Sequence, residues 1–391
     1  MRRYTPDDEE RIRSQAHVRA WSRAGLLDAA VAARLNEELR PDLRRTNDLL
    51  RAGLALFTFI IVIAAVVLVV TTSSSWKSGD VAPIAGGAAI ACLAIAEALV
   101  ARFRLYRFGV EEALAVSGAG LAALCAATTV DVVRGGQSGH APAIAAFTVA
   151  AAGGFWVYKR FGLAYAAIGA MLCAAAIAFE LDVSDSAARS MAAAFLLSAF
   201  ALARARRLSA EREFLADECA TIQAAAWIAA YLIMNLHVAD FVGPLILPAP
   251  VGPWFYWATY AAIWLMPPIG LALGARQRDR DLVDANILLA LGTLVTNKPY
   301  LGWPRHTWDP MLLGILLMVV ALGVRRWLAA GEGGARSGFT ALPLLSGDKD
   351  VVAAIGIASA TFRPAAPAGP PPPESGFNGG RSGGGGAGAG F

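Results

Sequence analysis

Long apolar runs alternate with short polar segments along most of the chain. Ten such runs follow from Gly53 onward, roughly over residues 53–72, 81–101, 110–131, 141–158, 161–181, 187–203, 221–240, 254–275, 282–297 and 310–329. Most of them reach the ~17–25 residues that an α-helix needs to cross about 30 Å of hydrocarbon. The sixth and ninth runs are the shortest. The pattern predicts an all-α, polytopic integral membrane protein with residues 52–330 as its membrane domain.

Basic residues fall mainly on one side of the predicted spans. The connections after even-numbered runs carry twelve of them and those after odd-numbered runs carry five. The positive-inside rule gives this alternation when the N-terminus is cytoplasmic. We therefore predict about ten spans, with both termini in the cytoplasm. The cytoplasmic set is Arg102, Arg104, Arg107, Lys159, Arg160, Arg204, Arg206, Arg207, Arg212, Arg276, Arg278 and Arg280, and the outer set is Lys77, Arg134, Arg189, Lys298 and Arg305.

The first 51 residues follow a more polar, helical pattern. Thr5 and the Pro-Asp-Asp that follows have the form of a helix start, with Asp8 placed for a capping box. Asp28 is expected to cap a second short helix. That helix should carry one apolar stripe, formed by Val31, Leu35 and Leu39. Residues 1–51 are thus predicted to form a small cytoplasmic helical hairpin.

Residues 331–391 form a Gly- and Pro-rich tail. From Pro364 to Phe391 the chain consists almost entirely of Pro, Gly, Ala and Ser. Such a segment cannot bury enough apolar surface to offset the entropy lost on ordering. We predict a disordered cytoplasmic tail. The simplest interpretation is a bare flexible tail, and the alternatives are a tether or a ligand for a protein partner.

The composition agrees with the membrane class and argues against several others. Charged residues make up 16% of the 391, whereas soluble domains carry about 25%. No secretory signal is expected, because about fifty residues of mixed charge precede the first apolar run. The chain has no phosphate-binding Gly loop, nucleophile elbow or dinucleotide fingerprint, so we expect no cofactor and no nucleic-acid partner. Neither disulfides nor metal ligands are expected of the four cysteines, Cys92, Cys125, Cys173 and Cys219.

Few ionisable groups occur inside the predicted spans, where such groups usually mark ion or proton pathways. Glu97 comes closest, about one turn from the cytoplasmic end of the second run and near Arg102. Pairing or snorkelling to the interface accounts for it. A proton-coupled pump is therefore disfavoured, whereas an uncharged pore or a lipid groove is not. The charged segment Arg204–Glu218 is predicted to be a solvated helix between two spans.

Two local patterns concern packing and repetition. Gly270-x-x-x-Gly274 in the eighth run predicts a seam at which another helix approaches closely. Tyr106–Val110, before the third run, is echoed by Tyr158–Leu163, before the fifth. Spans two–three and four–five are therefore either parallel repeated hairpins, as in transporter folds, or similar by chance.

Histidine and aspartate gather on the predicted outer face. Two pairs share the spacing His-x-x-Asp, which on a helix brings imidazole and carboxylate to the same face. Together they have the chemistry to bind a divalent metal, or to act as a base and its orienting group. The alternative is that polar residues simply collect where helices leave the membrane. The candidate metal ligands are His237, Asp240, His306 and Asp309, and no catalytic residue is predicted.

The head resembles a family of bacterial membrane proteins. Residues 21–32, Trp-Ser-Arg-Ala-Gly-Leu-Leu-Asp-Ala-Ala-Val-Ala, are similar to the opening of the domain of unknown function two-one-five-seven. Members of that family have a Trp-x-x-x-Gly-Leu-Ile-Asp-type helical hairpin, a basic stretch and then many spans. Trp76, after the first run, also fits, and the resemblance covers roughly residues 10–80. It implies a multi-pass membrane protein with a helical head and brings no activity with it.

Three functions are compatible with this sequence. The leading hypothesis is a non-enzymatic inner-membrane protein that binds a protein partner through residues 1–51 or the tail, because a capped head adjoins spans without interior charges. The second is a transporter or lipid-handling protein, which requires a cavity or groove between spans. The third is an outer-face metal-dependent enzyme, which requires the two His-Asp pairs to converge. An enzyme is less expected than a non-enzymatic protein.

Overall fold

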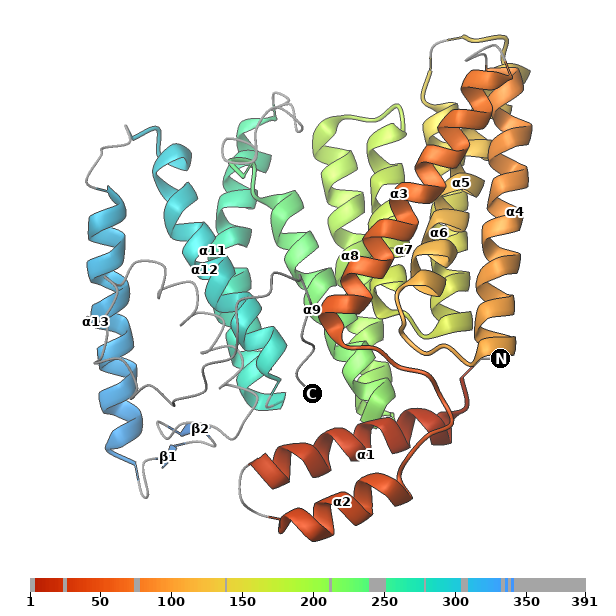
Figure 1. Cartoon of the computed structure of the whole chain (residues 1–391). Coiled ribbons are helices and arrows are strands. Elements are labelled where there is room, and N and C mark those ends of the chain that lie inside the picture. Colours follow the sequence, from red (N-terminus) through yellow and green to blue (C-terminus); the bar gives the residue numbers. More distant parts are fainter. Residues whose placement is uncertain are drawn as a thin grey trace, which may run out of the picture. The chain divides into compact units, whose positions relative to one another are not determined.

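A computed structural model describes residues 4–23, 27–73, 78–137, 139–210, 213–238, 251–277, 279–303, 309–331, 335–336 and 339–340, and it is almost entirely helical. Two short helices, α1 (Pro6–Arg23) and α2 (Ala29–Glu38), come first. A helix then occurs at each of the ten predicted apolar runs (Figure 1): α3 (Asp48–Thr72), α4 (Ser78–Phe103), α5 (Val110–Val133), α6 (Ala141–Phe161), α7 (Ala164–Ala176) continued by the 3-10 helix η1 (Ile177–Glu180), α8 (Asp185–Leu208), α9 (Glu213–Met234), α11 (Pro253–Gln277), α12 (Arg280–Tyr300) and α13 (Asp309–Ala329).

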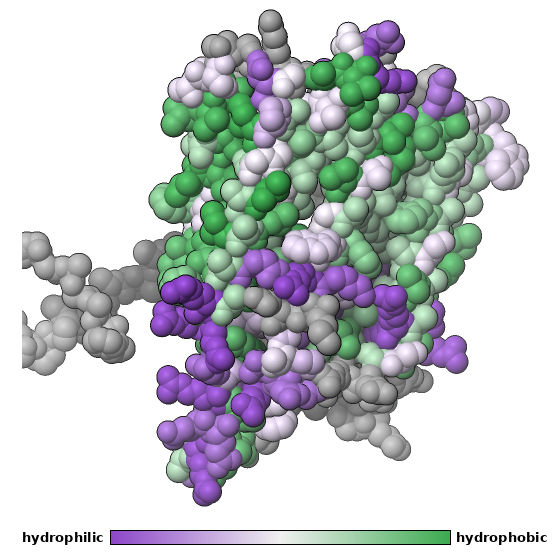
Figure 2. Space-filling model, turned by 90° about the vertical axis from the view of Figure 1, so that its right-hand side faces the viewer, coloured by the Kyte–Doolittle hydropathy of each residue, from purple (hydrophilic) through white to green (hydrophobic). Residues whose placement is uncertain are grey.

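Six helices in the described part of the chain are long and apolar enough to cross a membrane, namely α3, α4, α5, α6, α8 and α11. Their large apolar side chains point outward in many places; Phe57 on α3, for example, is 62% exposed. On the face shown in Figure 2, hydrophobic residues form a broad band, and hydrophilic ones gather below it, toward the head. Exposed apolar surface of this extent is unfavourable in water and suits a lipid environment. The chain is therefore a helical membrane protein.

Some helix boundaries differ from the sequence prediction. The predicted solvated helix over Arg204–Glu218 is wrong, because α8 extends to Leu208 and α9 already begins at Glu213. The fifth run is helical only from Ala164, and the seventh ends at Met234. Helical hydrogen bonds continue regardless of side-chain polarity, so a hydropathy change marks the edge of the hydrocarbon better than the end of a helix.

Two clusters of buried side chains hold the long helices together. The first joins α4, α5, α6 and the start of α7, and the second joins α7, α8, α9, α11 and α12. Helix α7 belongs to both, through Ala166 in the first and Met171 in the second. Alanines make up a large part of both clusters, and small residues let helix backbones approach closely in lipid.

The head is a helical hairpin, as predicted. Thr5 Oγ1 accepts a hydrogen bond from the Asp8 backbone N–H at 3.2 Å and donates to Asp8 Oδ2 at 2.6 Å, so the predicted cap forms. Asp28 precedes α2 in extended conformation but makes no side-chain cap. The predicted stripe is wrong at Val31, which is 48% exposed, whereas its neighbour Ala32 is buried. Methyl-sized Ala32 fits the close contact between α2 and α1, and Val31 faces away.

Tyr4 attaches the head to the membrane domain. Its hydroxyl donates to the Leu105 carbonyl at 3.1 Å, and its ring meets Tyr106 edge-on with centroids 4.8 Å apart. Beside this contact, Arg44 pairs with the same connection through two backbone hydrogen bonds of 2.9 and 3.0 Å. Burial raises the pKa of the Tyr4 phenol, and the carboxylates of Glu111 and Glu112 raise it further, so Tyr4 stays a neutral donor.

Neutral polar side chains join α9 to α12 inside the second cluster. Trp227 Nε1 donates to Asn286 Oδ1 at 2.8 Å, the hydroxyls of Tyr231 and Thr293 lie 2.9 Å apart, and Asn235 Nδ2 donates to Thr296 Oγ1 at 3.1 Å. All six side chains are buried. We call this set the polar ladder. Hydrogen bonds between helices of this kind fix which faces meet in an apolar environment.

A small β-hairpin follows α13. Its strands, β1 (Ala335–Arg336) and β2 (Phe339–Thr340), pair antiparallel. This hairpin is an addition to the all-α prediction. Residues 341–391, which contain most of the predicted tail, lie outside the described residues.

Candidate functional site

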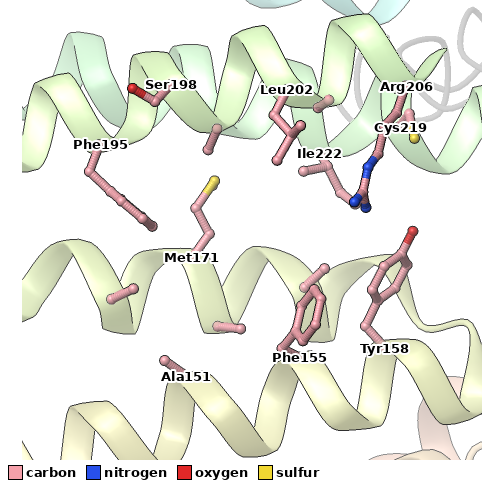
Figure 3. A pocket seen from close by; sticks show the side chains of 15 residues that line it. Ala151, Phe155, Tyr158, Met171, Phe195, Ser198, Leu202, Arg206, Cys219 and Ile222 are labelled. Atoms are coloured by element: carbon pink, nitrogen blue, oxygen red, sulfur yellow. The ribbon is translucent and has the colours of Figure 1, made fainter. Parts of the chain in front are cut away.

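An apolar groove lies between α6, α7, α8 and α9 (Figure 3). It encloses about 410 Å³, within the range of ~300–1,000 Å³ typical of ligand sites. Almost all of its lining surface is apolar. The side chains that give it its shape are Ala151 and Phe155 of α6, Met171 of α7, Phe195 and Leu202 of α8, and Ile222 of α9.

The spacing of residues on α8 and α7 explains why a groove forms there. Phe195, Ser198, Leu202 and Arg206 follow one another at intervals of three or four, so they share one face of α8. The α7 face opposite is built mainly of alanines at the same spacing. Because alanines do not fill the space between the helices, the α7 wall is recessed.

The groove extends over about half of a membrane. Phe195 and Arg206 lie eleven residues apart on α8, which corresponds to about 16 Å along the helix at ~1.5 Å per residue. The hydrocarbon core of a bilayer is about 30 Å thick. The groove therefore matches the depth of one leaflet.

One end of the groove is polar and basic. In Figure 3 the Arg206 guanidinium and the Tyr158 hydroxyl lie at the same end, far from Phe195. A second pocket of about 440 Å³ continues from there; it shares Tyr158, Arg206 and Cys219 with the groove and adds Lys159 and Ser209. Lys159 Nζ lies 5.5 Å from the ring centroid of Phe155, a groove residue. The site thus combines an apolar channel with a cationic mouth.

The head lies at the same end of the helices as this mouth. The mouth is lined by Ser209, just after α8, and by Leu215, in the first turn of α9. Two residues beyond Leu215, Asp217 forms an ion pair with Arg13 of α1. In Figure 1, α1 and α2 lie at the lower end of the long helices, where α8 ends and α9 begins.

The structure locates only part of the predicted metal site. His237 packs among aromatic rings, with Nε2 3.1 Å from the Tyr256 hydroxyl and its ring centroid 4.6 Å from that of Tyr300. Asp240 and His306 lie outside the described residues, as does the side chain of Asp309. Within the described part, no group of three or more His, Cys, Asp or Glu side chains has a metal-binding arrangement. Convergence of the two His-Asp pairs stays a prediction.

Two carboxylates near the helix ends, Glu97 and Glu112, form ion pairs. The partner of Glu97 is not the basic residue nearest to it in sequence. Glu97 pairs with Arg160 of α6, including a hydrogen bond of 3.1 Å to Nη2, where the sequence had pointed to nearby Arg102. Glu112 pairs with Arg51 of α3 at 2.8 Å. Pairing thus explains these carboxylates, although a contact 63 residues away in sequence could not be foreseen.

Neither the groove nor the polar ladder is predicted from the sequence. The ladder leaves a visible trace, since Trp227, Tyr231 and Asn235 recur every fourth residue along α9. The groove leaves almost no trace in the sequence, because alanines at helical spacing occur in most of the spans. Only Arg206, at the end of an apolar face, distinguishes its mouth.

Comparison with known proteins identified no relative of this chain. None of the protein-family models matches it, and neither the curated proteins nor the solved structures contain a match.

Proposed function

We propose that this chain is a multi-pass inner-membrane protein that binds a membrane lipid in the groove between α6, α7, α8 and α9. The observation that carries the proposal is the groove itself, apolar over about one leaflet and cationic at one end. It favours the lipid-handling hypothesis over the interaction head, which had been the leading one.

Lipid binding in such a groove depends on how closely the acyl chain packs and on contacts at the polar end of the groove. An acyl chain gains little hydrophobic free energy on moving from a bilayer to a protein groove, because both surroundings are apolar. Close packing against Met171, Phe195 and Leu202, and contacts at Arg206, therefore decide which lipid stays bound.

The proposed topology has about ten spans, with both termini cytoplasmic. A helix at each of the ten apolar runs supports the count, and the alternation of basic residues supports the sidedness. In this topology the groove mouth opens to the cytoplasmic leaflet. We also propose kinship with the family of domain of unknown function two-one-five-seven, supported by the helical head.

The proposal is tested by filling the groove. Ser198 faces the groove, and its hydroxyl only donates to the Ala194 carbonyl of its own helix, at 2.7 Å. Ser198→Trp should therefore block an acyl chain without breaking a contact between helices. The matched control is Ser190→Trp, because Ser190 is likewise exposed on α8 and donates to Ser186 at 2.7 Å, but does not line the groove.

The measurement is photolabelling in liposomes with a phospholipid that carries a diazirine in its acyl chain. We expect labelled peptides from the groove faces of α7 and α8, a several-fold loss of that label in Ser198→Trp, and no loss in Ser190→Trp. Equal groove labelling in all three proteins would exclude the groove as a lipid site.

A protein-binding head is the second candidate function. Trp21 and Val31 are both 48% exposed on the hairpin, outside the predicted spans. A photoreactive amino acid at position 21 should crosslink in cells to one discrete partner, and Val31→Asp should weaken that product. Crosslinking only to lipid would exclude a protein partner at this surface.

A further inference from the structure

We propose that the lipid in the groove is an anionic phospholipid, whose head group Lys159 and Arg206 bind at the cytoplasmic mouth. This inference rests on the proposed function, since the acyl chain of the same lipid occupies the groove. It adds the chemical class of the ligand and the two residues that select it.

These two cations differ in their pairing from several arginines nearby. Four arginines on the same end of the helices are paired with carboxylates: Arg51 with Glu112, Arg104 with Asp42, Arg160 with Glu97, and Arg207 with Asp279. Among the described residues, Lys159 and Arg206 have no carboxylate partner. Two cations are thus left at the mouth of an apolar groove.

The residues that line the mouth favour an anionic head group. Its described lining residues are Tyr158, Lys159, Arg206, Ser209, Ala210, Leu215 and Cys219, and no carboxylate is among them. A zwitterionic head group would bring its own ammonium beside two cations, and none of the described lining residues is an acid that could receive it. A net anionic phosphate diester has no such cost and forms charge-assisted hydrogen bonds with guanidinium and ammonium groups. Basic pockets between spans on the cytoplasmic side suit anionic head groups for this reason.

The two cations lie where the apolar groove meets its mouth. Arg206 lines both the groove and the mouth, and Lys159 lies over Phe155, which lines the groove. A head group bound by both would thus continue directly into a chain that packs along α8 toward Phe195. A soluble phosphate would leave this channel unfilled, so the site fits a lipid.

Arg206 also has a simpler explanation, as a cation in the last turn of α8. Basic residues there interact favourably with the partial negative charge of a helix C-terminus. Arg207 occupies the same turn and is paired with Asp279, whereas the Arg206 guanidinium points into the groove (Figure 3). If the helix end were the whole explanation, Arg206 would have no effect on lipid preference.

The test compares two photoreactive lipids with identical diazirine chains, phosphatidylglycerol and phosphatidylcholine, in liposomes of phosphatidylcholine. We expect the wild-type protein to give several-fold more groove label with the phosphatidylglycerol probe. The double variant Lys159→Gln/Arg206→Gln should lower that label to the phosphatidylcholine level and leave the phosphatidylcholine label unchanged. Unchanged phosphatidylcholine label also shows that the variant is folded.

The matched control is Arg102→Gln/Arg276→Gln. Both residues are exposed basic residues of the predicted cytoplasmic set, and neither lines the groove or its mouth, so the same net charge is removed elsewhere. This control should keep the preference for phosphatidylglycerol.

Each outcome decides one claim. Equal labelling by both probes in the wild-type protein would overturn the anionic head group while leaving groove binding intact. A preference that survives in Lys159→Gln/Arg206→Gln, or is lost equally in the control, would overturn the assignment to these two residues. If neither probe labels the groove, the proposed function itself is overturned.

Discussion

At Gly270 the backbone of α11 lies against the side chain of Asn286 on α12, with no room for even a methyl group. Asn286 is fully buried; it accepts a hydrogen bond from Trp227 and donates to the Leu282 carbonyl at 2.7 Å. Gly274, one turn further, also lies close to Val283, since an added Cβ would come within 2.8 Å of the Val283 side chain. The predicted seam of small residues is thus confirmed, and α12 is the helix that packs against it.

Gly270→Ala should destabilise the protein even though alanine favours helices. The propensity gain is about 1 kcal/mol, but the new methyl group displaces Asn286 and leaves buried polar groups unpaired, at about 1–3 kcal/mol per group. We expect a net loss of about 1–2 kcal/mol in the free energy of unfolding, measured by titration of detergent micelles with SDS. Gly120→Ala on α5 is the control, because a methyl group added there would meet no atom within 4 Å. Equal stability of the two variants would contradict the tight contact.

At the scale of elements, α1 differs from the long helices in how it is held. Tyr4, just before α1, contacts the α4–α5 connection, Ile12 packs against the first cluster, and Arg13 pairs with Asp217 at the start of α9. The long helices are held by continuous buried faces. An element held by few contacts opens at a lower free energy than the rest of the fold.

Tyr4→Ala should release α1 while the long helices keep their packing. The change removes both the ring contact with Tyr106 and the hydroxyl bond to Leu105. We expect faster amide hydrogen exchange across Pro6–Arg23 and unchanged exchange in α4 and α5. Tyr4→Phe, which keeps the ring and loses only one hydrogen bond of about 0.5–1.5 kcal/mol, should show a smaller increase. Unchanged exchange of α1 in Tyr4→Ala would show that other contacts dock the head.

At the scale of the whole molecule, the alternation of polar connections defines two sides. Gly136 lies in the α5–α6 connection and Trp303 after α12, both on the predicted outer side. Arg102 near the end of α4 and Ala330 after α13 belong to the predicted cytoplasmic side. These four positions therefore test the sidedness, and whether an odd or an even number of spans lies between them.

Single cysteines at these positions, in a chain whose four native cysteines are replaced by serine or alanine, should divide into two classes. We expect an impermeant maleimide to label positions 136 and 303 in intact spheroplasts, and positions 102 and 330 only after permeabilisation. Labelling of 303 and 330 from the same side would show that α13, the described helix between them, does not cross the membrane. Uniform labelling of 102 and 136 would contradict the topology altogether.

Hydropathy predicted the helices well because lipid leaves the backbone few alternatives. A buried chain without water must satisfy its own N–H and C=O groups, so each long apolar run becomes a helix. The interval Arg204–Glu218 shows the limit of this reasoning, since two helices extend past the apolar runs there.

Contacts between helices could not be predicted in the same way. Glu97 pairs with Arg160 across two helices, and the groove combines faces of four runs whose alanines look alike in sequence. Which helices pack together depends on how the side chains of distant segments fit. No local periodicity in a single sequence shows this fit. Arg206 was counted among the cytoplasmic charges, and its role at the groove mouth emerges only from its neighbours.

The neutrality of the polar ladder has a consequence for the electrical behaviour of the membrane domain. A full elementary charge moved across a membrane potential of about 100 mV contributes about 2.3 kcal/mol. Indole, phenol, amide and hydroxyl groups carry no net charge. If Trp227, Tyr231 and Asn235 exchange their hydrogen-bond partners on α12, no net charge moves across the membrane. The polar ladder itself should therefore add no voltage dependence to sliding of α9 along α12.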